Sequence, residues 1–265
     1  MEIIILKDYG EVNREVTRRI LSRIRSKPSS VLGMATGRTM RGIYRNLVFE
    51  YQKGNIDFSQ VTTFNLDEYL GFNHEDPITL HTYMQKNLLD HVNIHPGNIH
   101  IPPSRPEDFS AACREYEQKL LKSGGIDLQL LGIGREGHIG FNEPSSSLKA
   151  RTRVKTLTEI TLRDNFEDSK GPRFAITMGI GTIMEAREII LVALGSEKSE
   201  AVAGTVEGPV TAMCPASVLQ LHPKVKIIID EKAASGLEKQ DYYKWVWRHK
   251  HLVKKVSAGQ ESHES

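Results

Sequence analysis

The sequence predicts an α/β protein with a doubly wound, mostly parallel sheet and helices on both faces. The chain has 265 residues and is 39% hydrophobic, enough to bury one sizeable core. Short, uniformly apolar runs are typical of buried parallel strands, which have no solvated face. Segments of helical period separate these runs, and such alternation is the pattern of a Rossmann-like sheet with right-handed crossovers.

Six apolar runs are expected to form the strands, at residues 3–6, 31–34, 61–66, 126–131, 189–194 and 225–229. Three apolar stripes at helical spacing lie between them: Val12, Val16, Ile20 and Ile24; Met40, Ile43, Tyr44, Leu47, Val48 and Tyr51; and Phe109, Ala112, Cys113, Tyr116 and Leu120. We expect a single domain over residues 1–256. Residues 257–265 are small and polar and are expected to form a disordered tail.

Composition narrows the classes of partner. The net charge is +2, from 35 basic and 33 acidic residues, so nucleic acid and anionic membranes are not expected partners, and a small molecule is. Cys113 and Cys214 lie far apart without a C-x-x-C motif, which argues against a disulfide framework or a structural zinc site. Neither a signal peptide nor a run of membrane-spanning length is recognisable, which favours a cytoplasmic location.

Polar segments follow four of the expected strands. Open α/β sheets bind ligands beyond the carboxyl ends of their strands, so these segments are expected to meet at one edge. They contain Thr36, Gly37, Arg38 and Thr39; Asp67; Glu136, His138 and Glu143; and Lys198. The first group leads into a helix whose N-terminal amides suit an anion, and Lys198 follows a strand beside it.

The segment 131–144 is a glycine-rich loop that carries two acids around a histidine. Its glycines allow close backbone approaches, so that Glu136, His138 and Glu143 can converge on a small ligand and transfer protons. The spacing matches neither a dinucleotide-binding nor a P-loop motif, which disfavours a nucleotide. No second histidine lies at ligand spacing in the loop, so no metal is expected.

Each of these residues also has a structural interpretation. Asp67 is placed where aspartates close turns or cap helices, and Glu143 before Pro144 is placed to orient the loop. Lysines in the first turn of a helix, such as Lys198, are commonly solvated. The residues alone leave both interpretations open, and their gathering after four different strands favours a functional site.

Three motifs resemble the glucosamine-6-phosphate deaminase family, and the likeness covers nearly the whole chain. They are Thr-Phe-Asn-Leu-Asp-Glu-Tyr-Leu-Gly at 63–71, Gly-Arg-Glu-Gly-His-Ile-Gly-Phe-Asn-Glu-Pro at 134–144 and Leu-Gln-Leu-His-Pro at 219–223. Segment 151–158 is also similar to the family.

The resemblance implies aldose-to-ketose isomerisation with loss of ammonia, from glucosamine 6-phosphate to fructose 6-phosphate, without a metal or organic cofactor. Asp67 matches the base that moves a proton between C2 and C1, and His138 matches the acid/base that opens the ring. Glu143 matches the acid that orients this histidine. Thr36, Gly37, Thr39 and Lys198 match the phosphate-binding positions.

The sequence departs from the family pattern in three places. Glu136 stands where the family carries aspartate or asparagine, and Arg38 stands in an anion loop where the family has a small residue followed by Thr-Pro. The family's phosphate-binding arginine has no clear counterpart, and Glu167 falls near its place. Either Arg38 replaces the missing guanidinium, or the pocket has been rebuilt for another sugar or anion.

Regulation and assembly follow from the likeness as expectations. In allosteric members of the family, positions matching Ser146, Arg153 and Lys155 bind an amino-sugar phosphate effector, although a basic strand edge is an alternative interpretation. A homo-oligomer is expected.

Two other classes of function remain open, a non-catalytic sugar-phosphate-sensing domain and a sugar-lactone hydrolase of related fold. Residues 245–255 are basic and aromatic but too short for a DNA-binding domain, and are expected to form a docking helix.

Overall fold

The computed structural model describes residues 1–166, 171–250 and 252. Its main sheet has seven parallel strands in the order β1-β10-β9-β6-β2-β3-β5. These strands are β1 (Glu2–Leu6), β2 (Val31–Met34), β3 (Thr62–Asn65), β5 (Ile99–His100), β6 (Leu128–Leu131), β9 (Ile189–Ala193) and β10 (Val225–Asp230). The six expected strands are confirmed. The seventh strand, β5, was not predicted, because it has only two residues and does not lie in an apolar run. The expected tail, 257–265, lies outside the described residues.

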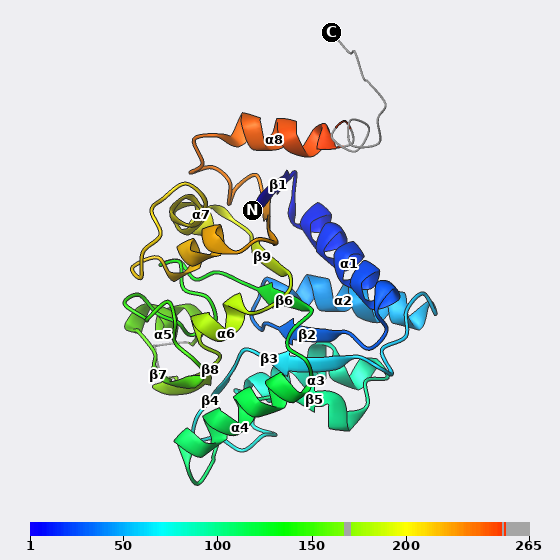
Figure 1. Cartoon of the computed structure of the whole chain (residues 1–265), viewed down its shortest axis with the longest axis vertical. Helices are drawn as coiled ribbons and strands as arrows, with labels where there is room; N and C mark the ends of the chain where they lie inside the picture. The colour runs from blue at the N-terminus through cyan, green and yellow to red at the C-terminus, as the bar shows by residue number, and fades with distance from the viewer. Residues whose placement is uncertain (167–170, 251, 253–265) are drawn as a thin grey trace.

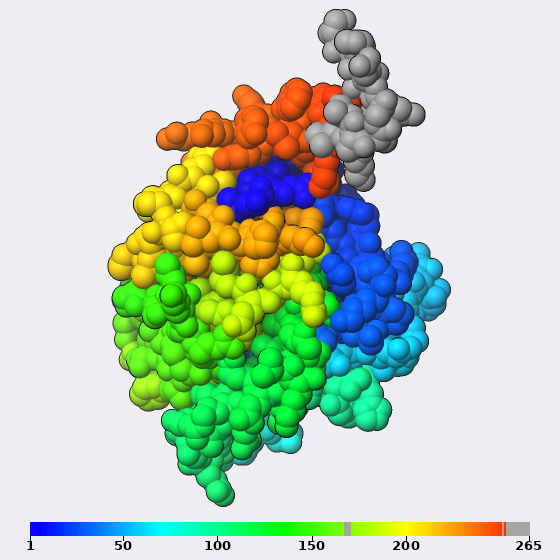
Figure 2. Space-filling model, viewed as in Figure 1, coloured from blue at the N-terminus to red at the C-terminus, as the bar shows by residue number. Residues whose placement is uncertain are grey.

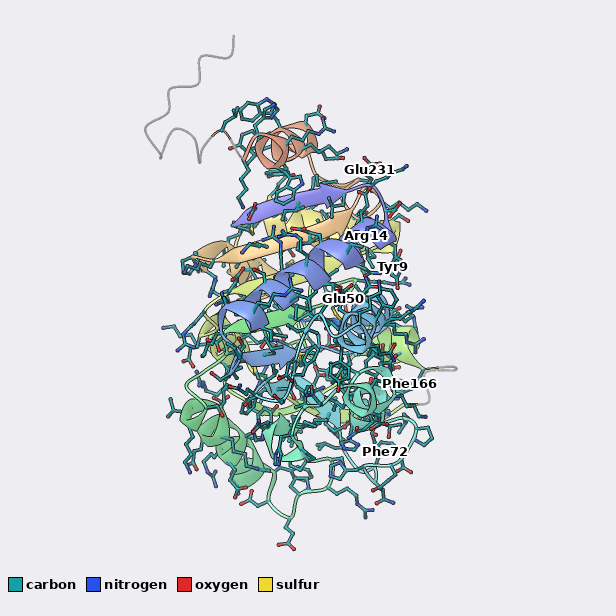
Figure 3. The ribbon with its side chains drawn as sticks, turned by 90° about the vertical axis from the view of Figure 1, so that its right-hand side faces the viewer. Tyr9, Arg14, Glu50, Phe72, Phe166 and Glu231 are labelled. Carbon is teal, nitrogen blue, oxygen red and sulfur yellow. The ribbon has the colours of Figure 1, made fainter. Side chains whose placement is uncertain are left out.

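Helices cover both sides of this sheet, as predicted (Figure 1). They are α1 (Tyr9–Ser26), α2 (Met40–Gln52), α3 (Leu80–Asn87), α4 (Phe109–Lys122), α5 (Glu159–Asn165), α6 (Ile180–Met184), α7 (Ser199–Val206) and α8 (Gln240–Arg248). The three apolar stripes form α1, α2 and α4. Figure 3 shows α1, with Tyr9 and Arg14 labelled, crossing in front of the strands.

Local sequence explains where α1 begins and which face it buries. The Asp8 carboxylate accepts a hydrogen bond from the Glu11 amide at 3.0 Å, which caps the first turn. One turn apart along the helix, Val12, Val16, Ile20 and Ile24 are all buried in the main core. The 3.6-residue period of the sequence is therefore the period of burial.

The chain winds in two directions from the middle of the sheet. From β2 it continues to β3 and β5 on one side, whereas from β6 it continues to β9 and β10 on the other. Because β2 and β6 are neighbours, the loops that follow them diverge and open a crevice at their carboxyl ends. This switch point is where the anion loop and the glycine-rich loop begin.

A second sheet was not predicted from the sequence. It is antiparallel, in the order β4-β8-β7, and consists of β4 (Asp67–Tyr69), β8 (Phe174–Thr177) and β7 (Arg153–Thr156). One row of its register places Asp67, Thr177 and Arg153 side by side. A smaller apolar cluster, formed by Tyr69, Leu80, Phe141, Leu157, Leu162 and Ala175, packs with it. Phe72 and Phe166, both labelled in Figure 3, are partly buried against this cluster.

Helix α8 lies across the strand at the edge of the main sheet. Figures 1 and 2 show it above β1, and its Trp247 is packed against the main core. The Arg19 guanidinium of α1 lies 5.6 Å from the Trp247 ring, and Lys250 pairs with Glu2 of β1. The docking helix expected from the sequence is thus confirmed over its described part. Among the described residues, no helix has the length and hydropathy needed to cross a bilayer.

Candidate active site

Asp67 opens β4 immediately after the carboxyl end of β3. The amide of Leu66, the residue before it, donates to the Met34 carbonyl of β2 at 3.0 Å, which fixes the chain at the switch point. Only 5% of Asp67 is exposed. Burial, followed by the charge of Glu68, raises the pKa of Asp67 to about 8. A carboxyl group with such a pKa can both accept and return a proton near neutral pH.

Glu68 ties this strand to α3. Its carboxylate accepts hydrogen bonds from the amides of Tyr69, Leu80 and His81 at 2.7, 2.9 and 2.7 Å. The last two amides belong to the first turn of α3, where a carboxylate is favoured. From the same helix, the Tyr83 hydroxyl donates to the Gly37 carbonyl at 2.7 Å. Helix α3 therefore joins the position of Asp67 to the anion loop.

The loop after β6 holds His138 against Glu143. The Gly134 amide donates to the His138 carbonyl at 2.9 Å, and the imidazole lies directly over Gly134, where a Cβ would come within 2.0 Å of the ring. His138 Nδ1 lies 3.1 Å from Glu143 Oε2. On the other side, Glu143 Oε1 accepts a hydrogen bond from the Thr161 hydroxyl of α5 at 2.6 Å.

Glu143 is buried but suited to remain ionised. Burial alone would raise its pKa, but His138, the Thr161 hydroxyl and the Thr158 amide outweigh burial and hold the pKa of Glu143 below its ordinary value. An ionised Glu143 can fix the orientation of the His138 imidazole.

Gly140 brings this loop onto Asp67. It has a φ of +53°, and a Cβ at this position would lie 3.3 Å from Asp67 Oδ2 and 2.9 Å from Thr177 Oγ1. The predicted convergence of Asp67 with the glycine-rich loop is therefore confirmed. Glu136, the other acid of the loop, is half-buried, and its Oε2 has no hydrogen-bond partner within the described residues. The acid that contacts His138 is Glu143.

The anion loop lies at the N-terminus of α2. Thr36, Gly37, Arg38 and Thr39 follow β2, and Thr39 makes no side-chain capping hydrogen bond. Lys198 ends a short 3-10 turn (Ser196–Lys198) that precedes α7. The amides at the start of α2 and the Lys198 ammonium group contribute positive potential beside the switch point.

Lys198 is half-buried, and its neighbours are charged. Burial lowers the pKa of Lys198; the charges of Asp164 and Glu197 oppose this shift, and those of Arg135 and Arg38 add to it. Arg135 and Asp164 were not singled out from the sequence. Arg135 Nε lies 3.2 Å from Asp164 Oδ2 of α5.

The missed residues left little signal. Arg135 immediately precedes Glu136 in the glycine-rich loop, so its position could have been noticed. Thr161, Asp164 and Thr177 reach the site through α5 and β8, whose packing is not apparent in the sequence.

Of the predicted effector positions, Arg153 and Lys155 lie in β7 and Ser146 lies in the segment before it. Arg153 donates to Asn142 Oδ1 of the glycine-rich loop at 2.8 Å and also lines a cavity of about 620 Å³ between α4 and β7. Lys155, two residues further along β7, lies on the same face as Arg153. The Ser146 hydroxyl is buried without a partner within the described residues.

Two further predictions concern Glu167 and the absence of a metal site. Glu167, which falls near the place of the family's arginine, lies outside the described residues. No cluster of three histidine, cysteine or carboxylate side chains is arranged to hold a metal within the described part of the chain.

The chain was compared with families, curated proteins and solved structures. The family model of glucosamine-6-phosphate isomerases/6-phosphogluconolactonase matches residues 9–228. Glucosamine-6-phosphate deaminase from Shewanella woodyi is 49% identical over 250 residues, which are 93% of this chain and 95% of that protein. The Hahella chejuensis enzyme of the same name is also 49% identical, with the same coverage.

Solved structures agree with this comparison. A monomeric glucosamine-6-phosphate deaminase superimposes with a TM-score of 0.87 at 42% identity, covering 89% of this chain and 100% of the other. A 6-phosphogluconolactonase from Trypanosoma cruzi superimposes with a TM-score of 0.72 at 19% identity, covering 89% and 97%. The second likeness concerns the fold alone.

Proposed function

The chain belongs to the glucosamine-6-phosphate isomerase/6-phosphogluconolactonase family, and we propose that it converts glucosamine 6-phosphate and water to fructose 6-phosphate and ammonia. The observation that carries this proposal is the approach of Gly140 to Asp67, because Gly140 belongs to the loop that holds the His138–Glu143 pair. A buried carboxyl group next to a loop with an imidazole–carboxylate pair can supply two separate proton-transfer groups to one small ligand.

The two groups have different tasks in the proposed reaction. His138, oriented by Glu143, exchanges a proton with the ring oxygen and opens the sugar. Asp67 then removes the proton from C2 and returns it to C1. The C2 carbon–nitrogen bond becomes an imine, which water hydrolyses to the ketone with release of ammonia. The pKa of about 8 makes the Asp67 carboxylate a stronger base than an ordinary aspartate.

The phosphate group is assigned to the positive site beside this centre. The amides at the start of α2, with Thr36, Gly37 and Thr39, and the Lys198 ammonium group supply donors for its oxygens. Arg38 is placed in the same loop. This assignment favours a phosphorylated amino sugar over a neutral one.

Assembly and regulation remain predictions. The sequence favours a homo-oligomer, whereas one solved relative is described as monomeric. Ser146, Arg153 and Lys155 are proposed to bind an amino-sugar phosphate effector, and the contact from Arg153 to Asn142 would connect an occupied effector site to the glycine-rich loop. Light scattering with and without N-acetylglucosamine 6-phosphate measures the assembly state.

Ammonia release from the purified protein tests the proposed reaction. Glucosamine 6-phosphate, galactosamine 6-phosphate and glucosamine are offered in parallel, and 6-phosphogluconolactone is offered as the lactonase substrate. We expect ammonia and fructose 6-phosphate from the first sugar, with little turnover of glucosamine. Lactone hydrolysis without ammonia release would replace this proposal with the hydrolase alternative.

A further inference from the structure

Three neighbouring strands each deliver one cation to the same edge of the main sheet. Arg38 follows β2, Arg135 follows β6 and Lys198 follows β9. In the sheet, β6 lies between β9 and β2, with parallel pairing on both sides. The carboxyl ends of parallel strands meet at one edge, so Arg135 is the central member of this group.

Carboxylates compensate the three cations only in part. Within the described residues, Arg38 and Lys198 have no ion pair, and Arg135 has one, to Asp164. Burial lowers the pKa of Lys198 most; the charges of Asp164 and Glu197 oppose this shift, and those of Arg135 and Arg38 add a smaller repulsion. A bound anion would convert this repulsion into attraction.

The backbone around Arg135 is fixed, whereas its side chain is accessible. The Gly134 amide donates to the His138 carbonyl at 2.9 Å, and the Gly137 amide donates to the Gly134 carbonyl at 3.0 Å, so a tight turn holds Arg135. The Arg135 side chain is 51% exposed. Its contact with Asp164 is made through Nε at 3.2 Å, and a guanidinium carries further N–H donors on its terminal nitrogens.

Substrate chemistry connects this arginine to the phosphate group. In glucosamine 6-phosphate the ring oxygen is bonded to C5, and C5 carries the phosphorylated C6. A group that protonates the ring oxygen therefore lies near the phosphate. Arg135 precedes His138 by three residues in the same turn.

We propose that Arg135 is a specificity-determining residue that binds the substrate's phosphate together with Lys198 and Arg38, in an orientation set by Asp164. The identity of the phosphorylated ligand rests on the proposed function. The guanidinium presents a planar fork of donors to phosphate oxygens, which an ammonium group does not reproduce.

Kinetics of Arg135→Ala and Arg135→Lys test this proposal. We expect Arg135→Ala to raise KM for glucosamine 6-phosphate by about 10- to 100-fold, with kcat within about 3-fold of the unaltered protein, and Arg135→Lys to restore part of the loss. The inhibition constant of inorganic phosphate should rise in parallel. Arg45→Ala is the matched control, since Arg45 is an exposed arginine of α2 and the charge change is the same. If Arg135→Ala leaves KM as Arg45→Ala does, Arg135 does not bind phosphate.

A binding measurement separates failure of this proposal from failure of the proposed function. If the unaltered protein releases no ammonia from glucosamine 6-phosphate, the reaction is wrong, but the anion site can still be tested by the rise in melting temperature with inorganic phosphate. A rise that Arg45→Ala retains and Arg135→Ala loses supports the phosphate-binding role. An equal rise in both variants, or no rise in the unaltered protein, overturns it.

Discussion

The proton-transfer centre and the anion site lie at the same switch point but are held in different ways. Glu143 is buried between His138 and Thr161, and Asp67 is buried beneath Gly140. Arg38 and Arg135, in contrast, are exposed. The protein thus fixes the groups proposed to move protons and leaves accessible the arginines proposed to capture a charged ligand. We expect changes in the first region to affect turnover and changes in the second to affect binding.

Asp67→Asn should have the largest effect on turnover. It removes the base while keeping the size of the side chain, so kcat should fall by about 100-fold or more, with a much smaller change in KM. Ammonia release with glucosamine 6-phosphate measures both constants. Full turnover in the variant would reject Asp67 as the base.

The same substitution should stabilise the folded protein at alkaline pH. The pKa of Asp67 is raised from 3.8 to about 8, so as pH rises above about 4 the unfolded chain ionises first and the folded state loses relative stability until about pH 8. Asp67→Asn removes this penalty. We expect urea unfolding to show a gain at pH 9 of up to about 6 kcal/mol, the linkage value of a pKa raised from 3.8 to about 8, that shrinks toward pH 4. A gain independent of pH would indicate that ionisation of Asp67 is not its cause.

On the anion side, Arg38→Ala should raise KM for glucosamine 6-phosphate by about 10-fold, corresponding to about 1.4 kcal/mol, with little change in kcat. The exposed Arg45 of the adjoining helix α2, replaced by alanine, provides the control. An unchanged KM in Arg38→Ala would assign Arg38 to the solvent.

The smallest effect is expected from Thr161→Val, which removes the 2.6 Å hydrogen bond to Glu143 but retains the shape of the side chain. Without this donor the pKa of Glu143 should move up toward its ordinary value, and kcat should fall by about 3-fold. The pH dependence of kcat measures the shift, with the exposed Thr156→Val as a control. Identical pH profiles for the two variants would argue that Thr161 does not tune the pair.

The sequence predicted the main sheet because its strands are continuous apolar runs, and burial of both faces leaves that pattern in any single sequence. The antiparallel sheet was not predicted, because β4, β7 and β8 have three or four residues each and mix polar with apolar side chains. Its existence depends on pairing between segments far apart in the chain, as between Asp67 and Thr177.

The candidate site divides in the same way. Asp67, His138 and Glu143 stand out because they follow apolar strands or lie among glycines, and both are local signals. The role of Arg135 depends on β6 lying between β9 and β2 and on the approach of Asp164, neither of which a local motif contains. Single arginines in polar loops are ordinarily solvated, so the strand order had to be known first.

Helix α8 affects how readily the protein can aggregate through the edge of its main sheet. Within the described part of the chain, strand β1 pairs only with β10, so its outer side presents backbone donors and acceptors with which another chain could pair and aggregate. The last described helix lies over this side, with Trp247 against the core and Lys250 paired to Glu2, and so occludes it (Figure 2). Because α8 comes long after β1 in the chain, the edge strand remains uncovered until α8 has been synthesised.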